Sequence, residues 1–236
     1  SRACQKWRFE LWEAYDQPQV GILYSWENDA AFARLSYGGP PIERMTEFEH
    51  YPAWARIGAM RALINNCVPF EIVTERNLKD GLASRYATIY IPHTICLETE
   101  IVRILREYVE AGGRVVDDTP SLLVQADDGT LYDTRQGSDF ERMFGLEIAA
   151  VQATFNRPRQ FHVQALSRFI SEVNITSAEV VDRLDDGYPA VLENRPGKGS
   201  ATFLTFEASA LCHKPGNAAM ERVIAETCLH GEPSFY

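Results

Sequence analysis

The stretch Tyr86–Pro120, YATIYIPHTICLETEIVRILREYVEAGGRVVDDTP, decides the fold. Its first part, residues 87–93, is rich in β-branched and apolar residues and is typical of a strand. A helix follows, because apolar side chains recur there at i, i+3 and i+4: Ile101, Ile104, Leu105, Tyr108 and Val109. Gly112-Gly113 ends this helix, since glycine readily adopts the left-handed conformation of a helix end. Residues 114–118 form the next strand, and a strand–helix–strand unit of this size predicts a right-handed crossover in a parallel sheet.

The same alternation extends to both sides of this unit. We predict strands at 19–25 and 69–75, with a polar turn, WENDA, at 26–30 and a helix at 52–64 that places Ala53, Ile57, Met60 and Ile64 on one face. After Pro120 we expect a short helix at 138–145, strands at 146–155 and 161–167, a hairpin at 188–207 and a last helix at 217–229. The fold class is therefore α/β, with a largely parallel sheet, helices on both faces and a late β-hairpin.

The chain divides into an N-terminal connector helix, residues 1–18, and one α/β domain, residues 19–236. Trp7, Leu11 and Tyr15 lie four residues apart and give the connector an apolar stripe. Two interpretations stay open: the stripe packs on its own domain, or it contacts an upstream domain.

Composition excludes several classes of function. The formal charge of −10, without a concentrated basic face, argues against a nucleic-acid partner. No apolar run is long enough to span a membrane. The five cysteines are widely spread and include no C-x-x-C pair, which indicates reduced thiols in the cytoplasm and argues against a disulfide framework or a zinc site. The histidines have no partners at metal-ligand spacing, so we expect no metal and no cofactor.

Candidate ligand-binding residues follow the ends of the predicted strands, where ligands of open α/β sheets bind. They are Trp26, Glu27 and Asn28 after the first strand, His93 after the third and Asp118 at the end of the fourth. Trp26 either stacks on a sugar or covers the sheet edge, and Asp118 either contacts a ligand or caps a turn. Glu27 would repel a phosphate, which argues against a bound FMN.

Cys96 is the one residue that raises the question of nucleophilic catalysis. It lies near a helix start, and His93 precedes it by three residues. Glu98 and Glu100 place negative charge beside it, which raises a thiol pKa. We therefore expect an ordinary thiol and no catalytic residue in this chain.

Three passages resemble one family. They are VGILYSWEN (20–28), the stretch from Tyr86 to Asp118, and YPAVLENRPGKGSATFLTF (188–206). Together they cover most of residues 19–230 and are similar to the middle domain of family-42 β-galactosidases, a trimerisation domain of the class I glutamine-amidotransferase-like type.

The resemblance implies a flavodoxin-like, glutamine-amidotransferase-like fold without a catalytic cysteine. In amidotransferases the nucleophile follows the strand after the GG exit, and this chain has Asp117-Asp118-Thr119 there. In the β-galactosidases the catalytic glutamates lie on a preceding (β/α)₈ barrel, so they correspond to no residue here.

The resemblance further implies a non-catalytic accessory domain that joins subunits and shapes a neighbouring carbohydrate site. Its partners would be further copies, a barrel domain of the parent protein, or both. Two rival hypotheses are a stand-alone hydrolase that uses Cys96 with His93 or an aspartate, and a small-molecule-binding module at the Trp26/Asp118 sheet edge.

Overall fold

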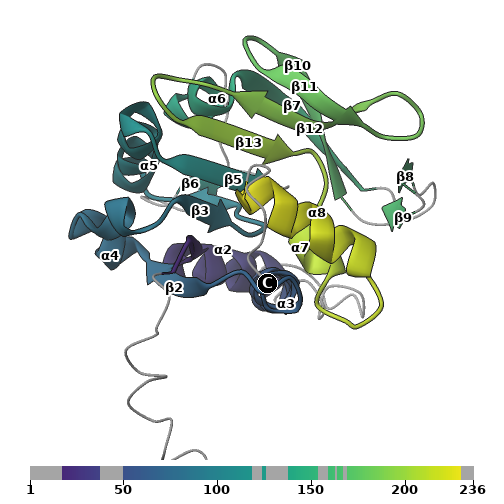
Figure 1. Cartoon of the computed structure of the whole chain (residues 1–236), viewed down its shortest axis with the longest axis horizontal. Coiled ribbons are helices and arrows are strands. Elements are labelled where there is room, and N and C mark those ends of the chain that lie inside the picture. The colour runs from purple at the N-terminus through teal and green to yellow at the C-terminus, as the bar shows by residue number, and fades with distance from the viewer. Residues whose placement is uncertain are drawn as a thin grey trace, which may run out of the picture.

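A seven-stranded sheet forms the centre of the molecule, in the order β11-β12-β13-β5-β3-β1-β2 (Figure 1). The computed structural model describes residues 18–37, 50–118, 124–125, 138–153, 159–162, 164–166 and 169–229. The strands of the central sheet are β1 (Val20–Tyr24), β2 (Phe70–Thr74), β3 (Thr88–Ile91), β5 (Arg114–Asp118), β11 (Glu179–Arg183), β12 (Pro189–Asn194) and β13 (Ser200–Leu204).

Helices and minor strands complete the described structure. The helices are α2 (Trp26–Tyr37), α3 (Tyr51–Asn65), α4 (Glu75–Lys79), η2 (Leu82–Arg85), α5 (Thr99–Ala111), α6 (Asp139–Phe144), α7 (Ala208–Leu211) and α8 (Ala218–Leu229). Three small sheets pair β4 (Cys96–Leu97) with β6 (Val124–Gln125), β7 (Leu146–Ala153) with β10 (Phe169–Ile175), and β8 (Arg159–Phe161) with β9 (Gln164–Leu166).

The five parallel strands have the flavodoxin-like order. Along the chain these strands occur in the order β1, β2, β3, β5 and β13. If they are numbered 1 to 5 in that order, their order across the sheet is 2-1-3-4-5. This is the doubly wound arrangement with a topological switch point between β1 and β3. The predicted hairpin is β12–β13, and β12 and β11 extend the sheet with antiparallel pairs. The predicted α/β fold class is confirmed.

Each face of the sheet has its own apolar core. On one face α3, α7 and α8 pack on the sheet around Ile22, Tyr90 and Phe206. On the other, α4, α5 and α6 pack around Ile89, Val115 and Phe203 (Figure 1). Burial of these side chains on both faces accounts for the continuous apolar runs of the central strands, as expected for a covered parallel sheet.

The two glycine motifs of the sequence meet in space. Lys198 and Ser200, in the β12–β13 turn, donate backbone hydrogen bonds to the carbonyls of Glu110 and Gly113 at the end of α5. A Cβ on Gly199 would lie 2.0 Å from the carbonyl oxygen of Gly113. The G-K-G turn therefore needs glycine at residue 199 because the backbone after α5 lies directly against it.

Three sequence predictions need correction. WENDA is the first part of helix α2 and not a turn: Ser25 Oγ accepts a hydrogen bond from the backbone N–H of Asn28 at 3.0 Å, and Glu27 and Asp29 occupy the first turn. Acidic residues are favoured there by the helix dipole. Residues 161–167 are not one strand, because the chain reverses at His162, which has a positive φ of 48°, between β8 and β9.

The third correction concerns α3, which is a helix as predicted but buries a different face. Its small residues pack inward, and a Cβ on Gly58 would lie 1.8 Å from the carbonyl oxygen of Ser209. Of the predicted stripe, Ile57 and Ile64 remain 51% and 59% exposed. Ile57 and Ile64 therefore face outward, whereas Met60 is partly buried against the core, because close approach to α7 requires the small-residue face.

The predicted connector helix with Trp7, Leu11 and Tyr15 lies outside the described residues. Among the helices that the structure does describe, none has the length and apolar character to cross a bilayer.

Candidate functional site

Asn28 bridges the topological switch point. Its side-chain Oδ1 accepts a hydrogen bond of 2.8 Å from the backbone N–H of Ile95, in the segment that follows β3. Asn28 lies on α2, directly after β1, so this bond connects the carboxyl ends of the two strands between which flavodoxin-like sheets bind ligands. The observed role of Asn28 is to hold this edge together, and its predicted ligand contact stays a prediction.

Asp118 lies at the centre of a buried network. Its Oδ1 accepts a hydrogen bond of 2.5 Å from the backbone N–H of His93. Its Oδ2 accepts three more, from the hydroxyl of Tyr90 and from the backbone N–H and the hydroxyl of Ser209. Burial raises the pKa of Asp118 to about 6, against the lowering effect of these hydrogen bonds.

His93 is the second member of this network. It has a positive φ of 46°, which directs its N–H toward Asp118, and its ring is fully buried. The ring lies 5.0 Å from Tyr51 and 5.6 Å from Phe32, centroid to centroid. His93 and Asp118 were predicted to share one sheet edge, and they do so as an internal brace between β3, β5 and α7. Their ligand role stays a prediction.

Cys96 is placed unfavourably for catalysis. It is buried in β4, which pairs with β6, and helix α5 begins only at Thr99. An amidotransferase nucleophile would be expected just after β5, which ends at Asp118, and Thr119 lies outside the described residues.

Trp26 and Glu27 belong to a separate, surface group. Trp26 is 67% exposed, and both residues line a cavity of about 400 Å³ at the carboxyl ends of β1 and β2. The other residues that line it are Tyr24, Thr74, Glu75, Arg76, Lys79 and Glu98. One carboxylate oxygen from each of Glu27, Glu75 and Glu98 lies within 4.8 Å of the others.

Two of these carboxyls have opposite pKa shifts. Burial, together with a hydrogen bond to Glu27, raises the pKa of Glu75 to about 8. The same hydrogen bond lowers the pKa of Glu27. Near neutral pH the pair therefore holds one proton, on Glu75. A retaining glycosidase needs its carboxyls about 5–5.5 Å apart with the scissile bond between them, whereas these two hydrogen-bond each other directly.

Sequence reasoning missed Glu75, Lys79 and Glu98 as members of this group. Glu75 directly follows β2, and the rule that placed Trp26 and Glu27 at the ends of strands applies to it equally. Glu98 was noted only for its effect on Cys96. Its ion pair with Lys79, at 2.5 Å between Nζ and Oε2, joins α4 to the start of α5 and has no local sequence signal.

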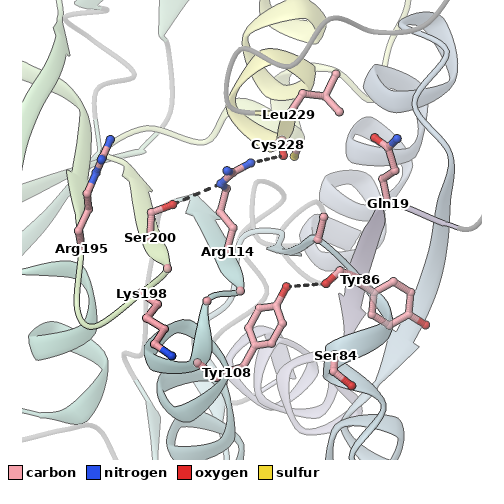
Figure 2. A pocket seen from close by; sticks show the side chains of 15 residues that line it. Gln19, Ser84, Tyr86, Tyr108, Arg114, Arg195, Lys198, Ser200, Cys228 and Leu229 are labelled. Carbon is pink, nitrogen blue, oxygen red and sulfur yellow. Dashed lines mark hydrogen bonds between the residues drawn. The ribbon is translucent and has the colours of Figure 1, made fainter.

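A larger cavity, of about 790 Å³, opens at the other end of the parallel strands. Figure 2 shows Arg114 at its centre, with hydrogen bonds to Ser200 Oγ and to the carbonyl of Cys228, and Tyr108 bonded to the carbonyl of Tyr86. Lys198 and Arg195 lie on the same wall. Arg114 and Lys198 lie beside the C-terminal ends of α8 and α5, whose carbonyls carry partial negative charge, and this accounts for their position. Arg195 instead forms an ion pair with Glu193.

Comparison with known proteins identifies the family. The family model described as the beta-galactosidase trimerisation domain matches residues 18–227. The chain belongs to this family. No curated protein matches the chain.

Solved structures share the fold of this trimerisation domain at low identity. A GH42 β-galactosidase from G. stearothermophilus has a TM-score of 0.71 at 22% identity, over 91% of this chain and 30% of its own. The β-galactosidase from Bacillus circulans sp. alkalophilus has 0.68 at 15%, over 92% and 32%.

An exo-β-1,4-mannosidase from Opitutaceae bacterium strain TAV5 has a TM-score of 0.60 at 18% identity, over 92% of this chain and 36% of its own. The chain thus spans about a third of the length of the solved structures it matches, and the same fold accompanies glycosidases with different sugars in their names.

Proposed function

We propose that this trimerisation domain is a non-catalytic accessory domain of a β-galactosidase-like glycoside hydrolase, and that it joins subunits beside a carbohydrate site. The family match over residues 18–227 carries the proposal. The catalytic barrel would belong to the remainder of the parent protein, since the matched glycosidases are about three times as long as the matched segment.

The outer face of α3 supports a role in self-association. Ile57 and Ile64 are two turns apart on one side of this helix and are more than half exposed. Ile72, on β2, is also exposed and pairs in register with Ile22, which packs on the α3 side of the sheet, so all three lie on the same side of the molecule. Apolar side chains grouped at a surface favour a protein contact.

The brace at Asp118 supports the non-catalytic part of the proposal over the hydrolase alternative. A reactive group needs a position open to substrate, whereas Asp118 accepts four hydrogen bonds from within the protein and Cys96 is buried. The small-molecule-binding alternative keeps one supporting observation, the cavity beside Trp26.

Trp26 supports a place beside a sugar site. An exposed indole next to carboxylates offers a flat apolar surface and hydrogen-bond acceptors, which sugars bind. We infer that Trp26 and Glu27 border the carbohydrate site of the parent protein. A cytoplasmic location is also part of the proposal, and the four described cysteines, none in a disulfide with another, support it.

Two measurements on the purified chain test this function. Sedimentation velocity over a hundredfold concentration range should show reversible association above the 26.7 kDa monomer. Assays with chromogenic galactosides should show no turnover. Turnover lost in Glu27→Gln or Asp118→Asn would establish an enzyme instead, and a strict monomer at every concentration would contradict the assembly role.

A further inference from the structure

The larger cavity, at the amino ends of the parallel strands, differs in charge from the chain as a whole. The sequence has 33 acidic and 23 basic residues. Among the described residues that line this cavity, every side chain that is charged at neutral pH is a cation: Arg114, Arg195 and Lys198. The volume of about 790 Å³ is that of a small-molecule site. The cavity is thus a local exception to the acidic character of the chain, and its charge favours an anion.

Arg114 is held in a fixed orientation in this cavity. It begins β5, and Ser200 begins β13 as its partner in the parallel register. The guanidinium donates from Nε to Ser200 Oγ at 3.3 Å and from Nη1 to the carbonyl of Cys228 at 3.1 Å (Figure 2). Both acceptors are uncharged, so these two bonds orient the cation without neutralising it. Ser200 is only 7% exposed, and because its Oγ accepts from Arg114, its own hydroxyl proton can be donated to a ligand.

Lys198 brings a second cation to the same cavity. Its backbone N–H donates to the carbonyl of Glu110 at 3.1 Å, which fixes the turn against the end of α5. The carbonyls of Tyr108 and Val109 accept backbone N–H groups as well. The ammonium of Lys198 makes no hydrogen bond or ion pair with the part of the chain that the structure describes. The end of α5 therefore explains where the turn lies, but it leaves the charge of this side chain available.

We propose that this cavity binds the phosphate group of a small molecule, with Arg114, Lys198 and the hydroxyl of Ser200 as its donors. Arginine binds phosphate through paired hydrogen bonds and lysine as a point charge. A phosphate group has more acceptor oxygens and more negative charge than a carboxylate, so it can engage all three donors at once. Arg195 is not part of the site, because Glu193 balances its charge. The site lies at the opposite edge of the sheet from Trp26 and does not depend on the proposed carbohydrate site.

Inorganic phosphate is the probe, titrated into the isotope-labelled chain at constant ionic strength. Amide chemical shifts in NMR spectra should change saturably at residues 112–114 and 198–200, which line the cavity. Lys198→Met should weaken binding about threefold or more, since an exposed ammonium contributes modestly to an ion pair. Lys214→Met is the matched control, because Lys214 is exposed but does not line the cavity, and it should bind phosphate as the wild type does.

A second variant and a second anion test the donor set and the ligand class. Ser200→Ala removes the hydroxyl donor and should also weaken phosphate binding; should it not fold by circular dichroism, Lys198→Met alone decides. Acetate has one negative charge and two oxygens, and it should bind the wild type more weakly than phosphate does. Shifts that do not saturate, equal phosphate affinities of the wild type and Lys198→Met, or acetate bound as tightly as phosphate would overturn the proposal.

Discussion

Ser209 donates both its backbone N–H and its hydroxyl to Oδ2 of Asp118, at 2.7 and 2.5 Å, across 91 residues of sequence. This contact joins the start of α7 to the carboxyl end of β5, and His93 and Tyr90 complete the set of donors. The edge of the sheet where amidotransferases place their nucleophile is therefore held together by a carboxylate that accepts four hydrogen bonds from the protein itself.

Replacement of this carboxylate should destabilise the fold strongly. Asp118→Ala leaves four buried donors without their acceptor, and each unsatisfied group costs about 1–3 kcal/mol, though such costs do not add fully. We expect a loss of at least about 3 kcal/mol, or roughly 6–12 °C in melting temperature. Asp80→Ala, which removes an exposed carboxylate, should change it little. Equal melting temperatures for the two variants would refute the bracing role.

The turn of the late hairpin provides a second stability test. Gly199→Ala would place a Cβ 2.0 Å from Gly113 O and 2.4 Å from Val109 O, so the backbone must shift. A loss of about 2 kcal/mol or more is expected, since overpacking costs about 1–3 kcal/mol. Gly81→Ala meets no atom within 4 Å but has a φ of 80°, and should cost only about 1 kcal/mol. Thermal denaturation compares the two, and a larger loss for Gly81→Ala would contradict the packing described.

Glu75 should make stability depend on pH. Its folded pKa of about 8 lies above the ordinary value of 4.5, so the folded chain holds a proton that the unfolded chain releases. The resulting stabilisation is complete below pH 4.5 and is lost as pH rises to about 8. Glu75→Gln cannot titrate and should match wild type near pH 5 but melt several degrees higher at pH 9. Parallel pH profiles for the two proteins would show that Glu75 has an ordinary pKa.

Cysteine labelling should separate the thiols by their environment. Cys67 is exposed, whereas Cys96, Cys212 and Cys228 are buried, and burial raises the pKa of the last two to about 12. With iodoacetamide at neutral pH, peptide mass spectrometry should find Cys67 alkylated well before the other three. Cys67 is thus the internal control, and alkylation of Cys96 ahead of it would revive the nucleophile hypothesis.

The sequence predicted those elements whose signals are local. The apolar stripe of α5 and Gly112, at which the helix ends, lie within one stretch of sequence. That stretch was enough to predict both the crossover and the parallel sheet. The orientation of α3 could not be predicted from a local signal. Both of its faces are apolar, and the choice between them depends on its packing against Ser209, far along the chain. Glu75 directly follows β2 and could have been found by the strand-end rule that found Glu27, whereas Glu98 joins this group only in the folded sheet edge.

Sedimentation velocity of an α3 variant tests the central claim, subunit assembly, most directly. Ile57→Asp with Ile64→Asp places two charges on the exposed apolar face of this helix. Val181→Asp is the matched control, because Val181 is 62% exposed on β11, at the other end of the sheet order from β2. Melting temperatures should show that both variants are folded. The account predicts concentration-dependent association for wild type and Val181→Asp, and a monomer at all concentrations for the double variant. Unchanged association of the double variant would contradict it.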